Sequence, residues 1–440
     1  MRLSCFITTC LLAVSVWAQP TARQWNQEVT AGWNLGNQLE CPPSGWNNES
    51  TDFGNPANAM QAETAWGNPV VTQQMLQAVK EAGFNAVRIP VRWQCHITDA
   101  ENMTIDPLWL QRVKEVVGYA LAYDMKVIIN SHHDMWLESR PTYHYKEYNN
   151  QKLTLLWTNI ANAFKDYGYD LAFAGTNEVH VPNNWNAPTA ENLSVQNSYN
   201  QTFVDAVRAT GGNNLKRHLV IQTYTCNADY GVNGQLIVPS DVEGNGKEYM
   251  SVEFHYYNPY DYCSGTSASE GGVYYWGQAY AQYGKISDSK ETAMRNAFQQ
   301  VTDAWGSQGL GVVMGEWGVS DHWLTTYKER MHENMTYYCK TLIIEARQQG
   351  ISTFVWDNNT FGNGTEKYGI FDRHNNMSLV ADWILTGIQQ GIATGISSPN
   401  ITSSASSLPA KKVLYQGKVC IWKGDKLYNL QGQELQKGVE

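Results

Sequence analysis

The sequence predicts a (β/α)8 barrel with a short C-terminal extension. Eight short runs of apolar and β-branched residues recur between Ala31 and Asn359, and patterns of helical period separate most of them. Strands that alternate with helices favour a parallel sheet, and eight such units are the number that closes a barrel. A doubly wound open sheet is the alternative, but no glycine-rich phosphate loop follows any of the eight runs.

The expected strands leave room for helices between neighbours. They are residues 31–37, 86–93, 126–133, 171–178, 218–225, 249–257, 311–318 and 352–359. One helix is expected to begin at Pro107, because Asp106 can cap it and proline favours the first helical position. Apolar stripes of helical spacing predict two further helices over 153–164 and 335–343, whereas 226–248 has the weakest helical pattern.

The two ends of the chain differ in composition from the barrel, which we assign to residues 19–395. Residues 1–18 contain Arg2, an apolar stretch and Ala18, the pattern of a secretory signal peptide that is too short to span a membrane. Residues 396–410 are rich in serine and proline and are predicted to be a linker. The tail, 411–440, is shorter than most domains that fold alone. We therefore expect a secreted or cell-surface protein with no membrane span.

The composition restricts the class of ligand. The 31 Lys+Arg are outnumbered by 41 Asp+Glu, and the net charge of −10 argues against a nucleic-acid partner. The chain has 17 Trp and 25 Tyr, more amphipathic rings than a core usually needs, and such rings suit a groove for a polyhydroxylated ligand. Among the cysteines that follow the signal peptide there is no close metal-type pair, and the sequence does not fix their disulfide connectivity.

Polar residues gather where the expected strands end. In a (β/α)8 barrel these ends meet at one face, where the active site lies. Glu178 and Glu316 end the fourth and seventh expected strands. Paired carboxyl groups, one protonated and one ionised, are what glycosidic-bond cleavage needs, and nearby cationic side chains can set their pKa values apart. The other candidates are Asn37, Arg88, His132, His133, Asn177, His255, Tyr257 and Trp356.

A metal site is the alternative explanation for the adjacent His132, His133 and Asp134. Successive residues of a strand face opposite sides, so the two imidazoles need not reach one ion. No His-x-His follows the first expected strand, where metal-dependent barrels of this kind usually carry it. We therefore expect no metal and no other cofactor.

Four stretches of the sequence resemble glycoside hydrolase family 5. They are 32–37 (GWNLGN), 63–69 (ETAWGNP), 83–93 (GFNAVRIPVRW) and 127–134 (VIINSHHD). The second stretch is similar to subfamily 4, which consists largely of endo-β-1,4-glucanases and xyloglucanases. The resemblance implies that Glu178 is the acid/base, Glu316 the nucleophile and Trp356 the platform under the −1 sugar. It also implies a supporting set, which comprises Arg88, His132, Asn177, His255 and Tyr257.

The function that the resemblance implies is that of a retaining endo-β-1,4-glucanase acting on cellulose-like or mixed-linkage glucan, with side activity on xyloglucan. A xyloglucanase, xylanase or mannanase on the same barrel is the alternative, and a non-catalytic carbohydrate-binding protein is another. The chain departs from the family at Ala174, where Glu is usual, at Val179 and His180, where Pro-Arg is usual, and at Trp317, where Phe is common. We expect a monomer whose partner is a β-glucan polysaccharide.

Three further expectations concern particular side chains and the tail. Repulsion between the two carboxyl groups is expected to hold the pKa of Glu178 up, and Arg88 is expected to favour the ionised form of Glu316. The tail is similar to the C-terminal sorting signals of type IX secretion substrates. Several tryptophans are candidates either for stacking on sugars or for core packing: Trp33, Trp46, Trp66, Trp136, Trp185 and Trp276.

Overall fold

The computed structural model describes residues 19–54, 59–265, 275–287, 289–323 and 327–394, together with the backbone of four strands between 410 and 435. The chain divides into two compact units, Met1–Ile396 and Ser397–Glu440. The predicted signal peptide and residues 396–409 of the predicted linker lie outside the described residues.

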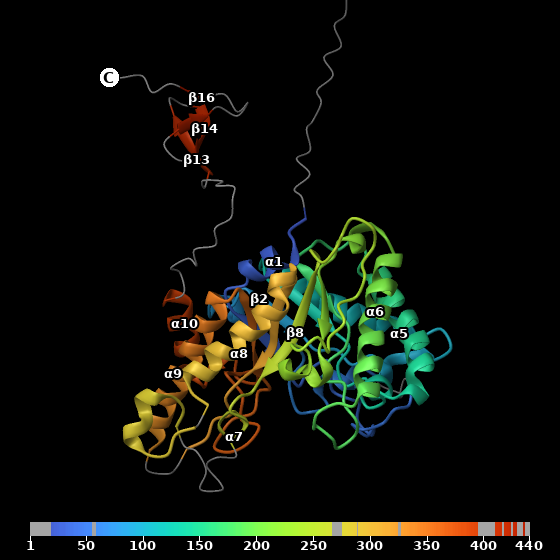
Figure 1. Cartoon of the computed structure of the whole chain (residues 1–440), viewed down its shortest axis with the longest axis horizontal. Helices are drawn as coiled ribbons and strands as arrows, with labels where there is room; N and C mark the ends of the chain where they lie inside the picture. Colours follow the sequence, from blue (N-terminus) through green and yellow to red (C-terminus); the bar gives the residue numbers. More distant parts are fainter. Residues whose placement is uncertain are drawn as a thin grey trace, which may run out of the picture. The chain divides into compact units, whose positions relative to one another are not determined.

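Eight parallel strands close into a barrel in the larger unit (Figure 1), which confirms the predicted (β/α)8 fold. Around the barrel the strand order is β1-β10-β9-β8-β7-β6-β5-β2. Each expected run overlaps one strand. The strands are β1 (Gly32–Leu35), β2 (Ala86–Ile89), β5 (Lys126–Asn130), β6 (Leu171–Ala174), β7 (Leu219–Gln222), β8 (Met250–Tyr256), β9 (Gly311–Trp317) and β10 (Ile351–Asp357).

Every residue of these strands is buried, because helices cover the outer face and side chains fill the interior. The first and last strands, β1 and β10, pair with Gly32 opposite Phe354. A Cβ atom at Gly32 would lie 2.2 Å from the Phe354 ring. Closure of the barrel at this point therefore requires glycine.

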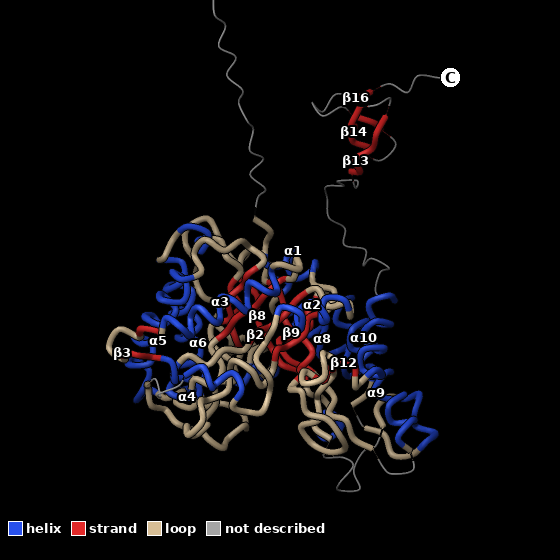
Figure 2. Tube along the Cα trace, turned by 180° about the vertical axis from the view of Figure 1, so that it is seen from behind, coloured by secondary structure: helices blue, strands red, loops and turns tan. Residues whose placement is uncertain are grey.

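Helices surround the strands in both views (Figures 1 and 2), with α5 packed against α6 and α9 packed against α10. The longer helices are α2 (Gln73–Glu81), α3 (Pro107–Leu121), α5 (Tyr143–Ala163), α6 (Ala190–Ala209), α8 (Glu291–Ala304), α9 (Lys328–Gln348) and α10 (Asp382–Thr394). The short ones are α1 (Ala22–Glu28), α4 (Met135–Glu138) and α7 (Tyr260–Cys263). Two short hairpins, β3 (Ile97–Asp99) with β4 (Thr104–Ile105) and β11 (Phe371–Asp372) with β12 (Ser378–Leu379), lie outside the barrel sheet.

All three predicted helices are confirmed. The first, α3, begins at Pro107, and the side chain of Asp106 accepts a hydrogen bond from the Leu108 amide at 2.9 Å. The other two, α5 and α9, are longer than the predicted stripes, and Phe164, which ends the first stripe, is the C-cap of α5. The first ten residues of α5 (YHYKEYNNQK) are mostly polar, so apolar periodicity reveals only the second half of that helix.

The connection from β7 to β8 contains no α-helix, which agrees with the weak helical pattern of this segment. Residues 223–249 are all described, and they form only two single turns of 3-10 helix, Tyr224–Cys226 and Ala228–Tyr230. This connection and α8 both contribute to the lining of the active-site cleft, through Ala228, Asp229 and Ala297.

The smaller unit is a four-stranded antiparallel sheet, described here by its backbone alone. Its strands are β13 (Ala410–Tyr415), β14 (Lys418–Lys423), β15 (Lys426–Tyr428) and β16 (Glu434–Leu435). The sequence showed only short apolar runs between Lys and Gly turns in this region. The first hairpin pairs Ala410 with Lys423 and Tyr415 with Lys418.

Within the described residues, five cysteines are buried and free: Cys41, Cys95, Cys226, Cys263 and Cys339. The side chain of Cys420 lies outside the described residues. None of the helices that the structure describes is both long enough and apolar enough to cross a membrane.

Candidate active site

A cleft of about 800 Å³ opens at the C-terminal ends of the barrel strands. Most of the predicted site residues line it: His132, His133, Asn177, Glu178, His255, Tyr257, Glu316 and Trp356. Arg88 lies within hydrogen-bonding distance of two of them and is itself fully buried. The parallel barrel therefore brings together side chains that are up to 268 positions apart in the sequence (Arg88 to Trp356).

Arg88 connects the strands beneath the cleft. Its Nη1 donates hydrogen bonds to Asn34 at 3.1 Å and to Glu316 at 3.0 Å, and its Nη2 donates to Asn177 at 2.7 Å. Its Nε lies 3.0 Å from an oxygen of Glu253. The planar guanidinium offers five N–H groups in a fixed geometry, so it aligns β1, β8, β9 and Asn177, three residues after the end of β6.

Glu178 and Glu316 face each other across His255. Carboxylate oxygens of the two glutamates and a ring nitrogen of His255 all lie within 4.8 Å of one another. The Nδ1 atom of His255 contacts Glu178 Oε1 at 2.6 Å, and the Tyr257 hydroxyl donates a hydrogen bond to Glu316 Oε2 at 3.2 Å. The Glu178 side chain is 27% exposed and that of Glu316 only 8%. Carboxyl groups this close affect each other's ionisation.

The expectation that repulsion holds up the pKa of Glu178 is wrong. Burial raises the pKa of Glu178, but the hydrogen bond and charge of His255 outweigh burial and lower it below the ordinary value. Burial raises the pKa of Glu316, and the charges of His255 and Arg88 offset only part of that rise. The sequence could not reveal this reversal, because it depends on the 2.6 Å contact between Glu178 and His255. Arg88 does contact Glu316, as expected.

His255 is the cation of this cluster. Burial lowers its pKa, whereas Cys226, Glu316 and Glu178 raise the pKa well above the ordinary value. Burial raises the pKa of the Cys226 thiol to about 12, so the thiol is uncharged at neutral pH and the two glutamates supply the negative charge. The imidazole and Glu178 therefore share one proton at neutral pH.

His132 and His133 both turn toward the cleft, although successive strand residues were expected to face opposite sides. That expectation is wrong because β5 ends at Asn130, and His133 has a left-handed backbone with φ of 56°. The two imidazole centroids lie 4.4 Å apart, and His132 is parallel to the Trp356 ring at 6.1 Å. Burial lowers the pKa of both histidines, that of His133 to about 4, so both are uncharged at neutral pH.

Asp134 does not join the adjacent histidines in one group. It accepts hydrogen bonds from the Ser131 hydroxyl at 2.6 Å and from two backbone amides. Among the described residues, the cluster with ligand atoms close enough for one ion is Glu178, His255 and Glu316. In this cluster His255 already contacts both carboxylates, Glu178 at 2.6 Å and Glu316 at 3.7 Å.

Asn37 is the one predicted site residue outside both the lining of the cleft and the contacts of Arg88. Its φ of 57° is a conformation that asparagine tolerates better than most residues. Its amide donates to Glu40, and its carbonyl accepts a hydrogen bond from Asn68 at 2.6 Å. These contacts hold the loop that follows β1.

Glu253 is a buried carboxylate that reasoning from strand ends missed, because it lies within β8 rather than at its end. Gln222 donates a hydrogen bond to it at 2.7 Å. Burial raises its pKa, but Arg88 and His255 lower it to about 2. A Cβ atom at Gly315 would lie 1.7 Å from Oε1 of Glu253, so only glycine leaves room for this carboxylate. The glycine before Glu316 is therefore the one feature of the sequence that indicates it.

The candidate tryptophans divide between core and surface. Fully buried rings belong to Trp33, Trp136 and Trp276. Trp46 is half-buried, whereas Trp66 is 38% exposed and Trp185 is 55% exposed. Trp66 meets His133 edge to face at 6.0 Å, and Trp185 stacks on His180 at 4.1 Å and lines the cleft. The exposed rings remain candidates for stacking on sugars.

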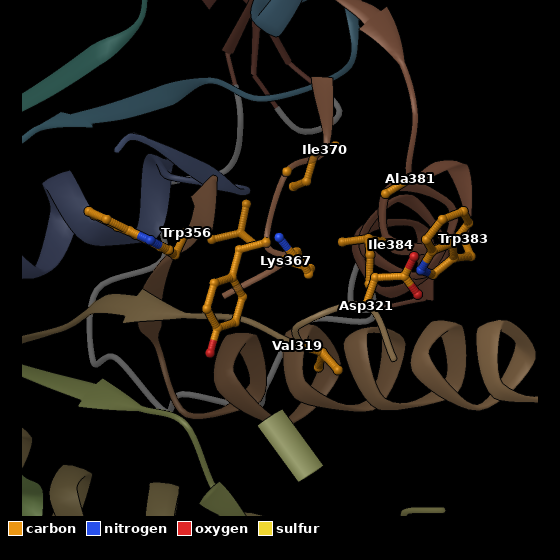
Figure 3. Close-up of a pocket in the computed structure, with 11 residues that line it drawn as sticks. Val319, Asp321, Trp356, Lys367, Ile370, Ala381, Trp383 and Ile384 are labelled. Carbon is orange, nitrogen blue, oxygen red and sulfur yellow. The ribbon is translucent and has the colours of Figure 1, made fainter. Parts of the chain in front are cut away.

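A second cavity shares Trp356 and Tyr368 with the cleft (Figure 3). Its volume is about 10 Å³, room for about one water molecule, so it cannot hold a sugar. In Figure 3 the indole ring of Trp356 extends away from the other labelled residues of this cavity. The ring is therefore available to the cleft.

Known proteins are similar to this chain in both sequence and fold. The family model described as cellulase (glycosyl hydrolase family 5) matches residues 50–362. Endoglucanase A of Paenibacillus barcinonensis is 33% identical over 385 residues, which cover 84% of this chain and 90% of that protein. A xyloglucan-specific endo-beta-1,4-glucanase of Bacteroides ovatus is 32% identical over 373 residues, 82% of this chain and 69% of that protein.

Solved structures agree with these relatives. A GH5-4 broad specificity endoglucanase from Ruminococcus champanellensis with bound cellotriose has a TM-score of 0.72 and 33% identity, covering 84% of this chain and 98% of that chain. The Bacteroides ovatus GH5 xyloglucanase in complex with a XXXG heptasaccharide has a TM-score of 0.75 and 29% identity, covering 85% and 77%. The chain therefore belongs to glycoside hydrolase family 5, and it is a glycoside hydrolase.

Proposed function

We propose that the protein is a secreted, retaining endo-β-1,4-glucanase that hydrolyses internal bonds of cellulose-like or mixed-linkage glucans, with side activity on xyloglucan. The observation that carries the proposal is the pair Glu178 and Glu316, whose nearest oxygens lie within 4.8 Å in an 800 Å³ cleft. Retaining glycosidases hold their carboxyl groups about 5–5.5 Å apart, whereas inverting enzymes leave about 6.5–9.5 Å for a water. The short separation supports double displacement.

In the first step, the Glu316 carboxylate attacks the anomeric carbon, and Glu178 gives a proton to the glycosidic oxygen as the carbon–oxygen bond breaks. Arg88 and Tyr257 contact different oxygens of Glu316, so they orient the carboxylate for attack. The indole of Trp356 supports the sugar at the −1 position. The products are a glycosyl ester on Glu316 and a free sugar hydroxyl.

The proton for this step comes from the Glu178–His255 pair. The two groups are 2.6 Å apart and share one proton, so an approaching glycosidic oxygen favours the neutral acid and the neutral imidazole. In the second step Glu178, now ionised, removes a proton from water. The resulting hydroxide attacks the same carbon, releases Glu316 and gives net retention.

The relatives support a β-1,4-glucan as the substrate, since their names include both endoglucanases and a xyloglucan-specific enzyme. The exposed rings of Trp66 and Trp185 give a chain several sugars long additional apolar surface. A xyloglucanase is the second candidate, supported by relatives and solved structures of that name.

Hydrolysis of a panel of polysaccharides tests the proposal. Reducing ends are measured on carboxymethylcellulose, lichenan, xyloglucan, xylan and mannan, and viscosity is followed on the first. We expect the viscosity to fall well before reducing ends accumulate, and the initial product seen by proton NMR to be the β-anomer. Release of cellobiose alone from the earliest time points would contradict endo cleavage, and an initial α-anomer would contradict retention.

Secretion and the tail are part of the same proposal. We propose that the chain is cleaved near Ala18 and that residues 411–440 direct export or surface attachment. Truncation after Ile396 should leave hydrolysis of soluble glucan nearly unchanged and should alter where the enzyme accumulates. A well-folded truncated protein that has lost most of its activity on soluble glucan would mean that the tail is needed by the barrel.

A further inference from the structure

We propose that Glu253 is a positioning residue, which fixes the proton of the Glu178–His255 pair and holds Arg88 against Glu316. This inference rests on the proposed function. Glu253 does not line the cleft, and its side chain is fully buried, so it acts through its neighbours rather than on the sugar.

The geometry places one carboxylate oxygen between two cations. Oε2 of Glu253 is anchored by the hydrogen bond from Gln222 at 2.7 Å. Oε1 lies 3.0 Å from Arg88 Nε and 3.5 Å from His255 Nε2. Oε1 of Glu253, Nε of Arg88 and Nε2 of His255 are all buried, and none of them has an aligned hydrogen-bond partner. The contacts are therefore electrostatic, and Glu253 is placed to stabilise both positive charges at once.

The strands are built to hold this carboxylate. Residues two apart on a strand share a face, so Glu253 and His255 both point into the barrel, one layer apart. The pairing of β8 with β9 shifts register between Phe254 and His255, and this shift sets His255 opposite Glu316. Gly315, which lacks a Cβ, leaves the space that Glu253 fills.

Among the charged groups around His255, Glu253 is the carboxylate whose charge persists through the reaction. The groups that face the imidazole are Glu178, Glu316, Cys226, Arg88, His132 and Glu253. Cys226 and His132 are uncharged at neutral pH. In the proposed mechanism Glu316 becomes a neutral ester and Glu178 alternates between acid and base. Glu253 takes no part in bond making, so it remains the counter-ion of His255 and Arg88 in both steps.

The variant Glu253→Gln tests this role, since it keeps the shape of the side chain and removes its charge. Without the anion the imidazolium is less stable, so the Glu178–His255 pair loses its proton at a lower pH. We expect the basic limb of the kcat/KM profile to move down by about one pH unit or more. We expect kcat to fall by roughly tenfold or more, with KM little changed, because Arg88 is no longer held in place.

Two further variants control the experiment. Glu345→Gln removes another buried, ion-paired glutamate, the partner of Arg295 on α8, and should leave the pH profile unchanged. In Gly315→Ala the new Cβ overlaps Oε1 of Glu253 and should displace that carboxylate. The basic limb of the kcat/KM profile should then move to lower pH, as in Glu253→Gln. Gly315→Ala provides the test if Glu253→Gln does not fold, which thermal unfolding will show.

A measurement that does not need a substrate separates this inference from the proposed function. The ¹⁵N signals of His255, assigned with a His255→Asn variant, report its ionisation in the wild-type protein and in Glu253→Gln. We expect the midpoint of the imidazolium titration to fall in the variant. An unchanged midpoint together with an unchanged basic limb would overturn the inference and leave the glucanase proposal intact. A lowered midpoint in a protein that cleaves no β-glucan would contradict only the proposed function.

Discussion

The two ends of the barrel hold buried histidines in opposite states of charge. At the N-terminal end, His218 contacts the Ser251 hydroxyl at 2.7 Å and meets Trp25 edge to face at 4.8 Å. Burial, helped by the charges of Lys126 and Arg208, lowers its pKa to about 3. At the C-terminal end, the pKa of His255 is raised well above its ordinary value. The same kind of side chain, buried at both ends, is neutral at one end and cationic at the other.

The difference lies in the partners that each end supplies. The N-terminal end is closed by α1, whose Asn26 bonds to Ser251 at 3.0 Å, and by an apolar cluster that includes Trp25 and Phe354. The C-terminal end instead surrounds its histidine with three carboxyl groups and an arginine. A neutral hydroxyl and an aromatic ring contact His218, whereas His255 contacts charges that are costly to bury but are needed for acid–base chemistry.

The largest effect is expected from Glu316→Ala, which removes the proposed nucleophile. Activity should fall by on the order of 10⁴-fold or more on both natural glucan and activated aryl glycosides, because the covalent step is lost. Azide should give no β-glycosyl azide. A variant that keeps more than a small fraction of wild-type activity in steady-state assays would remove Glu316 from this role.

A smaller effect, dependent on the substrate, is expected from Glu178→Ala. Cellulose-like substrates should slow by roughly 10²–10⁴-fold, because their leaving oxygen needs a proton. An aryl glycoside whose phenol leaves unaided should still form the glycosyl-enzyme, and azide should release it as the β-glycosyl azide. Full activity on cellulose would show that another group is the acid.

The contrast between the two ends is sharpened by a pair of stability variants. Arg88→Met removes the guanidinium that pairs with the buried Glu253 and Glu316, and it should cost about 3–5 kcal/mol of unfolding free energy as well as activity. Asn26→Ala should cost about 1–3 kcal/mol, through the loss of its bonds to Ser251 and Ser352, and should leave kcat and KM unchanged. Urea unfolding and steady-state kinetics measure both. Loss of activity in the Asn26 variant would contradict the claim that the N-terminal end contributes to stability and not to catalysis.

An effect similar in size to that of Asn26→Ala concerns pH and the N-terminal end. The pKa of His218 is about 3 in the folded protein and about 6.5 in the unfolded chain. Between these two pH values the unfolded chain therefore binds one more proton than the folded protein. The wild-type protein should therefore lose stability as the pH falls from about 6 toward 4. In His218→Gln this loss should be smaller by about 1.4 kcal/mol per pH unit. The free energy of unfolding in urea is measured across this pH range. Equal slopes of that free energy against pH for the two proteins would show that His218 is not neutral.

The fold could be predicted from the sequence because its signals are local and repeated. Each strand is a short apolar run. The Asp106 cap marks the start of α3, and apolar stripes reveal the presence of α5 and α9 but not their ends. Parallel strands end at one face, so the polar residues that end them, such as Glu178 and His255, were expected to meet there, and they line one cleft. The sheet of the smaller unit was not predicted, because its region shows only short apolar runs between Lys and Gly turns and no alternation with helices.

The remainder of the site depends on distances that no pattern encodes. Glu253 lies in mid-strand, where polar residues carry no positional signal, and only the space above Gly315 reveals its place. The orientation of His133 follows from one left-handed residue just past the end of β5. The ionisation of Glu178 and Glu316 depends on the distance of each carboxylate from His255, which is 2.6 Å for Glu178 and 3.7 Å for Glu316.

Covalent trapping tests the central claim most directly. The wild-type enzyme is incubated with 2,4-dinitrophenyl 2-deoxy-2-fluoro-β-cellobioside, whose fluorine slows both steps and whose phenol makes the first step the faster one. Mass spectrometry of the digested protein should then find one added fluorocellobiosyl group, on the peptide that contains Glu316. A group on the peptide that contains Glu178, or no adduct in an enzyme that cleaves β-glucan with initial release of the α-anomer, would contradict double displacement through Glu316.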